Sequence, residues 1–192
     1  RNVKDAQGNV TGRTTTNDYA QADYYYVDKS SLPKVYGGFN TAFSYKGFEL
    51  SAIFAYSIGG YIVDRDVTML WSNGSNPGRA WSTEILKRWT PENRDTDVPA
   101  LKTVSNNWNS NSTRNLFNNS YLRMKNITLS YNFPQPLIKK ISLSSLQLFV
   151  QADNLLTFSK NQGMDPEQGI TGLTYYRYPA MRSISGGLNV SF

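Results

Sequence analysis

The chain has 192 residues, with 20 basic and 14 acidic side chains that give a net charge of +6, and it contains no cysteine and no histidine. These absences exclude disulfides, thiolate sites and catalytic sets that need histidine or cysteine. The basic residues are scattered rather than clustered, which argues against nucleic-acid binding. We therefore expect no enzyme, no cofactor and no metal site in this chain.

Hydropathy and aromatic content further limit the class of protein to which the chain can belong. No apolar run approaches the ~18 residues of a transmembrane helix. Aromatic residues make up 14% of the chain although its mean hydropathy is −0.50. This combination suits a β-barrel with a polar lumen, and it suits a tyrosine-rich soluble β-protein almost as well.

The first part of the chain, residues 1–36, is polar and irregular, and we expect mainly loop, with the end of an earlier strand around Tyr24–Val27. The sequence does not begin with methionine and shows no signal peptide, so we expect a C-terminal piece of a longer protein. From Phe39 onward, apolar and polar residues alternate as far as Lys46, and the alternation restarts with Phe48. This pattern predicts two strands joined by a tight turn at Lys46–Gly47.

A long loop is predicted over residues 57–120, which hold all four tryptophans. Within it, Pro77 stands at a favourable first position for a short helix. Trp81, Ile85 and Trp89 would then share one helical face, where they could contact a partner protein. The favoured alternative is that this face packs within the loop.

Three more strands complete the pattern: 121–133, one centred on Leu146–Asp153, and 182–192. Polar residues alternate with the apolar ones, and a loop over 159–181 precedes the last strand. In the last strand, the apolar positions resemble the C-terminal assembly signal of a barrel protein, with an aromatic residue for the girdle at the membrane interface; these positions are Ile184, Leu188, Val190 and Phe192.

The predicted fold class is all-β: the five C-terminal antiparallel strands, or so, of a large transmembrane β-barrel. Strands of roughly 9–11 residues suit a tilted crossing of a bilayer. Short turns at one end and long loops at the other, one of them with a short helix, are the outer-membrane pattern. Because five strands leave open edges in lipid, the rest of the barrel is expected from missing chain or from other subunits.

Eight sequence blocks, in order, resemble the C-terminal part of the SusC/RagA-type TonB-dependent outer-membrane transporters. They are Tyr36-Gly-Gly-Phe-Asn-Thr41, Tyr45-Lys-Gly-Phe48, Trp89-Thr-Pro-Glu-Asn93, Tyr121-Leu-Arg-Met-Lys-Asn-Ile-Thr-Leu129, Asp153-Asn-Leu-Leu-Thr157, Met164-Asp-Pro-Glu167, Tyr178-Pro-Ala-Met-Arg182 and Gly187-Leu-Asn-Val-Ser-Phe192. The resemblance covers residues 36–192, while 1–35 would be a loop or strand remnant of the preceding barrel.

The resemblance implies a barrel of about 22 strands with a plugged lumen. It also implies TonB-driven import of large nutrients, oligosaccharides or peptides, across the outer membrane of a Bacteroidetes-type Gram-negative cell. A SusD-like surface lipoprotein would cover the outer loops. The plug domain and the TonB box, through which TonB would act, are absent from this sequence. The polar strand positions would line the lumen or hold the plug: Asn126, Thr128, Ser130, Gln147 and Gln151.

Three basic residues stand at apolar positions near the long loops: Arg123, Lys125 and Arg182. Charges near the membrane interface cost little, and we hypothesise that these contact lipopolysaccharide phosphates. The alternative is that the outward alternation breaks above the membrane and they pair with loop acids. Asp165 and Glu167 are such acids, and a structural role in their turn is favoured over ion binding.

Two other functions stay open at this point. Several copies of the chain could donate strands to a shared structural barrel, although an odd number of strands argues against this. A soluble β-sandwich binding module would instead bury the alternating faces against a second sheet.

Overall fold

The computed structural model describes the whole chain except residues 17, 72–77, 103–109, 111, 161–163 and 168. The chain forms two compact units. One unit comprises residues 1–29 and 64–116, and the other comprises residues 30–63 and 117–192. Each unit is described by itself.

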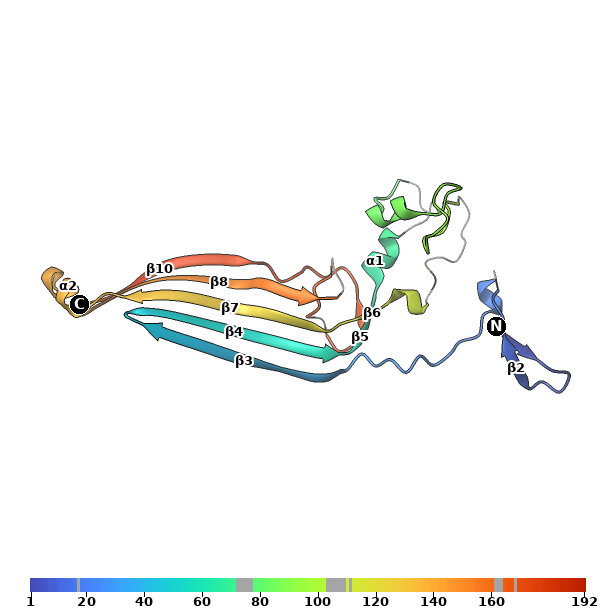
Figure 1. Ribbon diagram of the computed structural model, residues 1–192, viewed down its shortest axis with the longest axis horizontal. Coiled ribbons are helices and arrows are strands. Elements are labelled where there is room, and N and C mark those ends of the chain that lie inside the picture. Colours follow the sequence, from blue (N-terminus) through green and yellow to red (C-terminus); the bar gives the residue numbers. More distant parts are fainter. Residues whose placement is uncertain (17, 72–77, 103–109, 111, 161–163, 168) are drawn as a thin grey trace. The chain divides into compact units, whose positions relative to one another are not determined.

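The second unit contains a five-stranded antiparallel sheet, with the order β10-β8-β7-β4-β3 (Figure 1). The five predicted strands are therefore confirmed, and several are longer than the alternation indicated. Their bounds are β3 Pro33–Tyr45, β4 Phe48–Gly59, β7 Tyr121–Asn132, β8 Ser145–Ser159 and β10 Ser183–Ser191.

Short connections lie at one end of this sheet. The predicted turn between β3 and β4 is confirmed: Lys46 and Gly47 have φ values of 47° and 88°, as in a type I′ turn. The connection from β7 to β8 contains α2 (Gln135–Ile138) and η4 (Lys139–Ile141). Prolines before and within α2 keep the strand from continuing.

A smaller three-stranded sheet has the order β6-β5-β9. It comprises β5 (Tyr61–Asp64), β6 (Leu116–Asn118) and β9 (Leu173–Thr174). The chain bends between β4 and β5 at Gly59 and Gly60, whose φ values of 84° and 78° suit glycine.

The first unit begins with a hairpin of β1 (Asn2–Lys4) and β2 (Val10–Arg13), followed by η1 (Tyr19–Gln21). The strand expected around Tyr24–Val27 is wrong, because this segment has no strand pairing and its side chains are exposed.

In the described part of residues 64–116, the first unit contains three short helices: α1 (Arg65–Leu70), η2 (Thr83–Lys87) and η3 (Thr113–Asn115). Asn76 and Pro77, where a helix was predicted to start, lie outside the described residues. The described residues 78–82 are not helical, so the helical segment is limited to the five residues of η2. Gly78 has φ of +83°, a left-handed conformation that interrupts a right-handed helix.

The fold has little conventional core. Among the described residues, the buried apolar side chains are Ala52, Ile62, Ile85, Val98, Ile138 and Ala152. Two of them are small residues in the middle of the large sheet, while most large apolar side chains of its strands are exposed. Within the described residues, no helix has the length and apolarity for crossing a membrane.

Candidate functional site: a two-faced sheet and its loop clamp

The cross-strand register sorts the large sheet into an apolar and a polar face. Leu188 of β10 faces Leu148, which faces Tyr131, then Phe48 and Tyr45 across the sheet. Because residues directly opposite each other point to the same face, this row is apolar from edge to edge. The neighbouring rows on this face contain Ile184, Val190, Val150, Leu129, Leu50 and Phe43.

This apolar face is open. Of the predicted assembly-signal residues, Ile184, Leu188 and Val190 lie on it, and Ile184 is 73% exposed. Phe192 follows the last strand and is 92% exposed. A contiguous apolar surface of this kind requires a non-aqueous cover. Recognition of these residues by an assembly machinery stays a prediction.

The opposite face is a hydrogen-bonded polar surface centred on Asp153. Its carboxylate accepts hydrogen bonds from Asn126 Nδ2 at 2.7 Å and from Ser183 Oγ at 3.1 Å. Asn126 Oδ1 in turn accepts a bond from Thr128 Oγ1 at 3.0 Å. These bonds connect side chains of β7, β8 and β10, so the polar face is one network over three strands.

The network continues toward the short-turn end of the sheet. Asn189 donates from Nδ2 to Gln147 Oε1 at 2.8 Å, and Gln147 Nε2 donates to Ser130 Oγ at 3.4 Å. The predicted lumen-lining residues therefore share one face: their register places Gln151 beside Thr128, and Gln147 is bonded to Ser130.

The register changes at Lys125. On one side of it, Asn126 pairs with Ile53, and on the other side Met124 pairs with Phe54, so β7 has one extra residue relative to β4 there. A β-bulge of this kind reverses which positions point to each face. Consequently, Arg123 lies on the polar face. The prediction that it points outward assumed one alternation along the whole strand, and this assumption is wrong.

Arg123 forms the centre of an ionic cluster, which we call the loop clamp: Arg123, Lys125, Asp165 and Glu167. Its Nη2 contacts Asp165 Oδ1 at 2.5 Å, and its Nη1 contacts Glu167 Oε2 at 2.8 Å. The third donor, Nε, bonds to Thr157 Oγ1 of the adjacent strand at 3.1 Å. The side chains of Arg123 and Asp165 are only 4% and 8% exposed.

The acids of the clamp come from the loop between β8 and β10. Asp165 also accepts backbone hydrogen bonds from Ala180 at 2.7 Å and from Glu167 at 2.9 Å. Burial alone would raise the pKa of Asp165, but these two N–H groups and the Arg123 guanidinium together lower it below its ordinary value. The carboxylate is thus held ionised, and it ties the two ends of the loop together.

Lys125 contributes a second, more exposed contact, because its Nζ lies 2.5 Å from Glu167 Oε2. The structure therefore pairs Arg123 and Lys125 with loop acids, which was the alternative stated for them. Arg182 is exposed beside an open cavity of about 640 Å³, whose wall includes Arg123 and Asp165. Contact of any of these residues with lipopolysaccharide stays a prediction.

Further bonds fix the same loop to the sheet unit. Asn154, in a left-handed conformation with φ of 52°, donates from Nδ2 to the carbonyl of Met181 at 3.1 Å. Ser31 Oγ donates to the carbonyl of Ile170, and the N–H of Val63 donates to the carbonyl of Gly172, both at 2.8 Å. The loop is therefore held at several points along its length.

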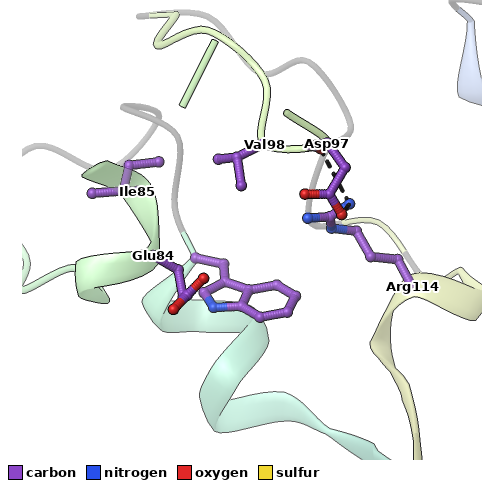
Figure 2. A pocket seen from close by; sticks show the side chains of 6 residues that line it. Glu84, Ile85, Asp97, Val98 and Arg114 are labelled. Carbon is purple, nitrogen blue, oxygen red and sulfur yellow. Dashed lines mark hydrogen bonds and ion pairs between the residues drawn. The ribbon is translucent and has the colours of Figure 1, made fainter. Parts of the chain in front are cut away.

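The first unit contains a small pocket of about 120 Å³ (Figure 2). Two carboxylates, Glu84 and Asp97, and the apolar side chains of Ile85 and Val98 line it. Arg114 Nη1 lies 3.3 Å from Asp97 Oδ2, and its guanidinium is 5.3 Å from the ring centre of Trp71, which completes the lining.

The predicted partner-binding residues lie around η2 but do not share a helical face. Ile85 is buried in the wall of the small pocket, Trp81 is half-buried, and Trp89 is 43% exposed. Packing within the loop thus explains the burial of Ile85. Trp89 is the one of the three residues whose exposed surface is available for contact with another protein. Contact with a partner protein stays a prediction for all three.

Sequence reasoning contained the pairing with loop acids only as an alternative, and it did not locate the bulge that produces this pairing. The available signal was the presence of two basic residues, Arg123 and Lys125, at apolar positions of a strand. Charge at such positions indicates either a membrane interface or a change of register, and the alternation alone does not separate the two.

Comparison with known proteins identifies the relatives, although no family model matches the chain. The chain is 32% identical over 166 residues to TonB-dependent receptor P3 of Formosa agariphila, covering 81% of this chain. It is 30% identical over 165 residues to TonB-dependent receptor P39 of the same organism. The chain spans only 16% of the length of each of these relatives.

Solved structures agree with this relationship. The RagAB peptide importer in its closed-closed state matches 99% of this chain with a TM-score of 0.77 and 33% identity. A second structure, of the RagAB peptide transporter, matches 86% of the chain with a TM-score of 0.73 and 32% identity. The chain covers 20% and 18% of those proteins.

The apolar face of the sheet thus has its non-aqueous cover in the lipid of an outer membrane, as in Bacteroidetes such as Formosa. The sheet is open because the chain represents only part of a closed barrel. The chain belongs to the SusC/RagA-type TonB-dependent outer-membrane transporters and corresponds to a C-terminal stretch of their β-barrel.

Proposed function

We propose that this chain is the C-terminal barrel wall of an active importer of large nutrients. The observation that carries the proposal is the two-faced sheet, in which an exposed apolar face backs a hydrogen-bonded polar face. A barrel built this way separates lipid from a polar passage. The family relationship supports energy coupling through TonB, which would act on parts of the protein outside this sequence.

In this proposal the chain itself performs no chemistry. The Asp153 network and the glutamine and asparagine side chains beside it form a section of the lumen wall, against which a plug or a passing solute lies. The loop clamp keeps one connecting loop fixed on the polar face, so that this loop narrows the entrance in a defined way. Gating would then come from other, movable parts.

The substrate class is the finer part of the proposal. Large oligosaccharides and peptides are the two candidates, and the name of the RagAB peptide importer favours peptides by similarity alone. A SusD-like surface lipoprotein is the proposed lid. Trp89 is the residue of this chain that we propose for contact with the lid, and Arg182 the one for contact with lipopolysaccharide.

Uptake measurements in the native host test this function. Deletion of the parent gene should abolish uptake of either labelled oligosaccharides or labelled peptides, and the intact gene should restore it. The restored uptake should disappear when TonB is removed. Unchanged uptake of both substrate classes in the deletion strain would contradict the proposal, as would full uptake without TonB.

A further inference from the structure

The short-turn end of the sheet carries an unusual surface. The connection from β7 to β8 contains two adjacent lysines, Lys139 and Lys140, and both are exposed. On either side of them, Leu137 is 56% exposed and Ile141 is 62% exposed. Two large apolar side chains and two cations therefore project together from one seven-residue segment.

Leu137 and Ile141 are exposed although the segment itself is folded and anchored to the rest of the unit. Ile138, between Leu137 and Lys139, is 2% exposed and anchors the segment. The carbonyl of Ile138 accepts a hydrogen bond from the N–H of Leu143 at 3.1 Å, and Gln135 Nε2 donates to the carbonyl of Ser144 at 2.9 Å. The segment is thus folded, with one apolar side chain inward and two outward.

Aromatic side chains cluster at the same end of the sheet. The ring centres of Phe48 and Tyr131 are 4.6 Å apart, and those of Tyr131 and Phe133 are 5.0 Å apart. Aromatic rings at the ends of membrane-spanning strands mark the level of the lipid headgroups. The segment 135–141 begins just beyond this level, at the end of the apolar face.

Among the described residues, the charged side chains at this end are all basic, and the C-terminal carboxylate of Phe192 is the one negative group beside them (Figure 1). Lys46, in the β3–β4 turn, joins Lys139 and Lys140, and the stretches 45–48 and 132–145 contain no acidic residue. The nearest acid in sequence, Glu49, pairs with Ser130 and so belongs to the polar face. A cationic rim beside exposed leucine and isoleucine complements an anionic lipid surface, because the apolar side chains enter the interface and lysine stems reach its phosphates.

We propose that segment 135–141 is a binding site for the headgroups of anionic phospholipids, with Lys139 and Lys140 as the phosphate-contacting residues and Leu137 and Ile141 as the inserted side chains. The proposal rests on the membrane-spanning role of the sheet but not on import or on its substrate. Each lysine near an anionic surface should raise local lipid binding about fivefold.

Lipid-specific quenching in the reconstituted full-length parent transporter tests this proposal. The 192 residues contain no cysteine, so a dye can be attached at Ser142→Cys, beside the segment, after replacement of any cysteine elsewhere in the parent. The bilayer is a mixture of phosphatidylglycerol and phosphatidylcholine in which only one of the two lipids carries bromine near its headgroup. We expect brominated phosphatidylglycerol to quench several-fold more than its mole fraction predicts.

Substitutions identify the groups responsible. The double variant Lys139→Gln/Lys140→Gln should return the quenching to the value set by mole fraction. The matched control Lys4→Gln/Lys102→Gln, which removes two exposed lysines of the other unit, should leave the preference intact. Leu137→Ser should reduce quenching by both lipids, because the segment would lie less deeply.

Three results would overturn the proposal. Equal quenching by the two lipids in the unmodified segment would show no preference for anionic headgroups. Absence of quenching by either lipid would mean that protein covers the segment. Equal loss of preference in the control variant would mean that the attraction is a general effect of net charge. None of these measurements depends on uptake, so failure of the import proposal is recognised separately.

Discussion

Arg123 shows how one side chain can be positioned by its own strand, by the adjacent strand and by a distant loop. The bulge at Lys125 points its guanidinium to the polar face, and Thr157 of the adjacent strand occupies one of its donors. The remaining donors reach Asp165 and Glu167, which lie 42 and 44 positions further along the chain. A buried arginine with all three nitrogens bonded is a structural anchor for the loop.

Substitution of Arg123 should release the loop without unfolding the barrel. Removing one partner of a buried ion pair costs about 3–5 kcal/mol, because the other charge stays buried and uncompensated. For Arg123→Gln we therefore expect amide hydrogen exchange in residues 164–181 to accelerate by a factor of about 10² or more. Exchange within β4 and β8 should not change.

The matched control is Lys125→Gln. The pair Lys125–Glu167 is about one-third exposed on both sides, and exposed pairs contribute about 0–1 kcal/mol. Exchange in the loop should therefore rise by less than about fivefold. If the two variants accelerated exchange equally, the burial of Arg123 would not be the source of the anchoring.

Acid should open the same loop. The folded-state pKa of Asp165 is lowered, so its contribution to loop stability is fully present above its ordinary value of 3.8 and disappears as pH falls through the lowered value. Protection of residues 164–181, corrected for intrinsic exchange rates, should be constant from pH 7 to about pH 5 and fall below about pH 4. The Asp165→Asn variant should be loosely held and show no such transition.

At the scale of single elements, β7 combines two strand segments of opposite facing. Residues beyond the bulge toward β8, from Asn126 to Asn132, follow one alternation, and Tyr121–Met124 follow the other. The extra residue at Lys125 shifts the alternation by one position, so that Arg123 points inward although the other odd-numbered residues from Ile127 to Tyr131 point outward.

Deletion of Lys125 should test this use of the bulge. Without the extra residue, Asn126 follows Met124 directly, and regular alternation keeps Arg123 on the polar face. The clamp then loses only the exposed pair Lys125–Glu167, which contributes about 0–1 kcal/mol. We expect the deletion variant to fold as well as Lys125→Gln, which keeps the bulge, read from heat-modifiable mobility in gel electrophoresis. A large loss of folded barrel in the deletion variant alone would contradict this account.

Strands and turns were predictable because their signals are local. A period of 2 and the pair Lys46–Gly47 specify the hairpin, and the polar partners of Asp153 follow from the same alternation. The bulge was not predictable because a one-residue shift leaves each half of β7 with a valid alternation. The prediction of a helix starting at Pro77 did not account for the left-handed conformation of Gly78. Glycine permits this conformation, but its presence in a sequence does not show that the conformation is adopted.

At the scale of the whole chain, the two units have different kinds of stability. The sheet unit relies on strand pairing and a lipid cover, whereas the first unit has a few buried side chains such as Ile85 and Val98. Sequence analysis gave the loop clamp only as an alternative, because which acid of a long loop returns to which strand depends on the complete fold.

Two substitutions around η2 should separate packing from partner binding. Ile85→Ala removes a buried side chain and should destabilise residues 78–100 by about 2–4 kcal/mol, seen as faster hydrogen exchange there. Trp89→Ala should leave exchange nearly unchanged but weaken co-purification of the surface lipoprotein from native membranes. If Trp89→Ala accelerated exchange as strongly as Ile85→Ala, its role would be packing rather than partner contact.

The polar face has a consequence for motion along the barrel wall. Asp153, Asn126, Gln147 and Asn189 use donors and acceptors on one another, so part of their bonding capacity is already occupied. A hydroxyl or amide of a moving solute therefore gains little by stopping there, since each new bond displaces an existing one of similar strength. For an importer, such a wall would be polar enough to admit a polar solute. Because its side chains already bond to one another, it would bind that solute only weakly and would not retain it.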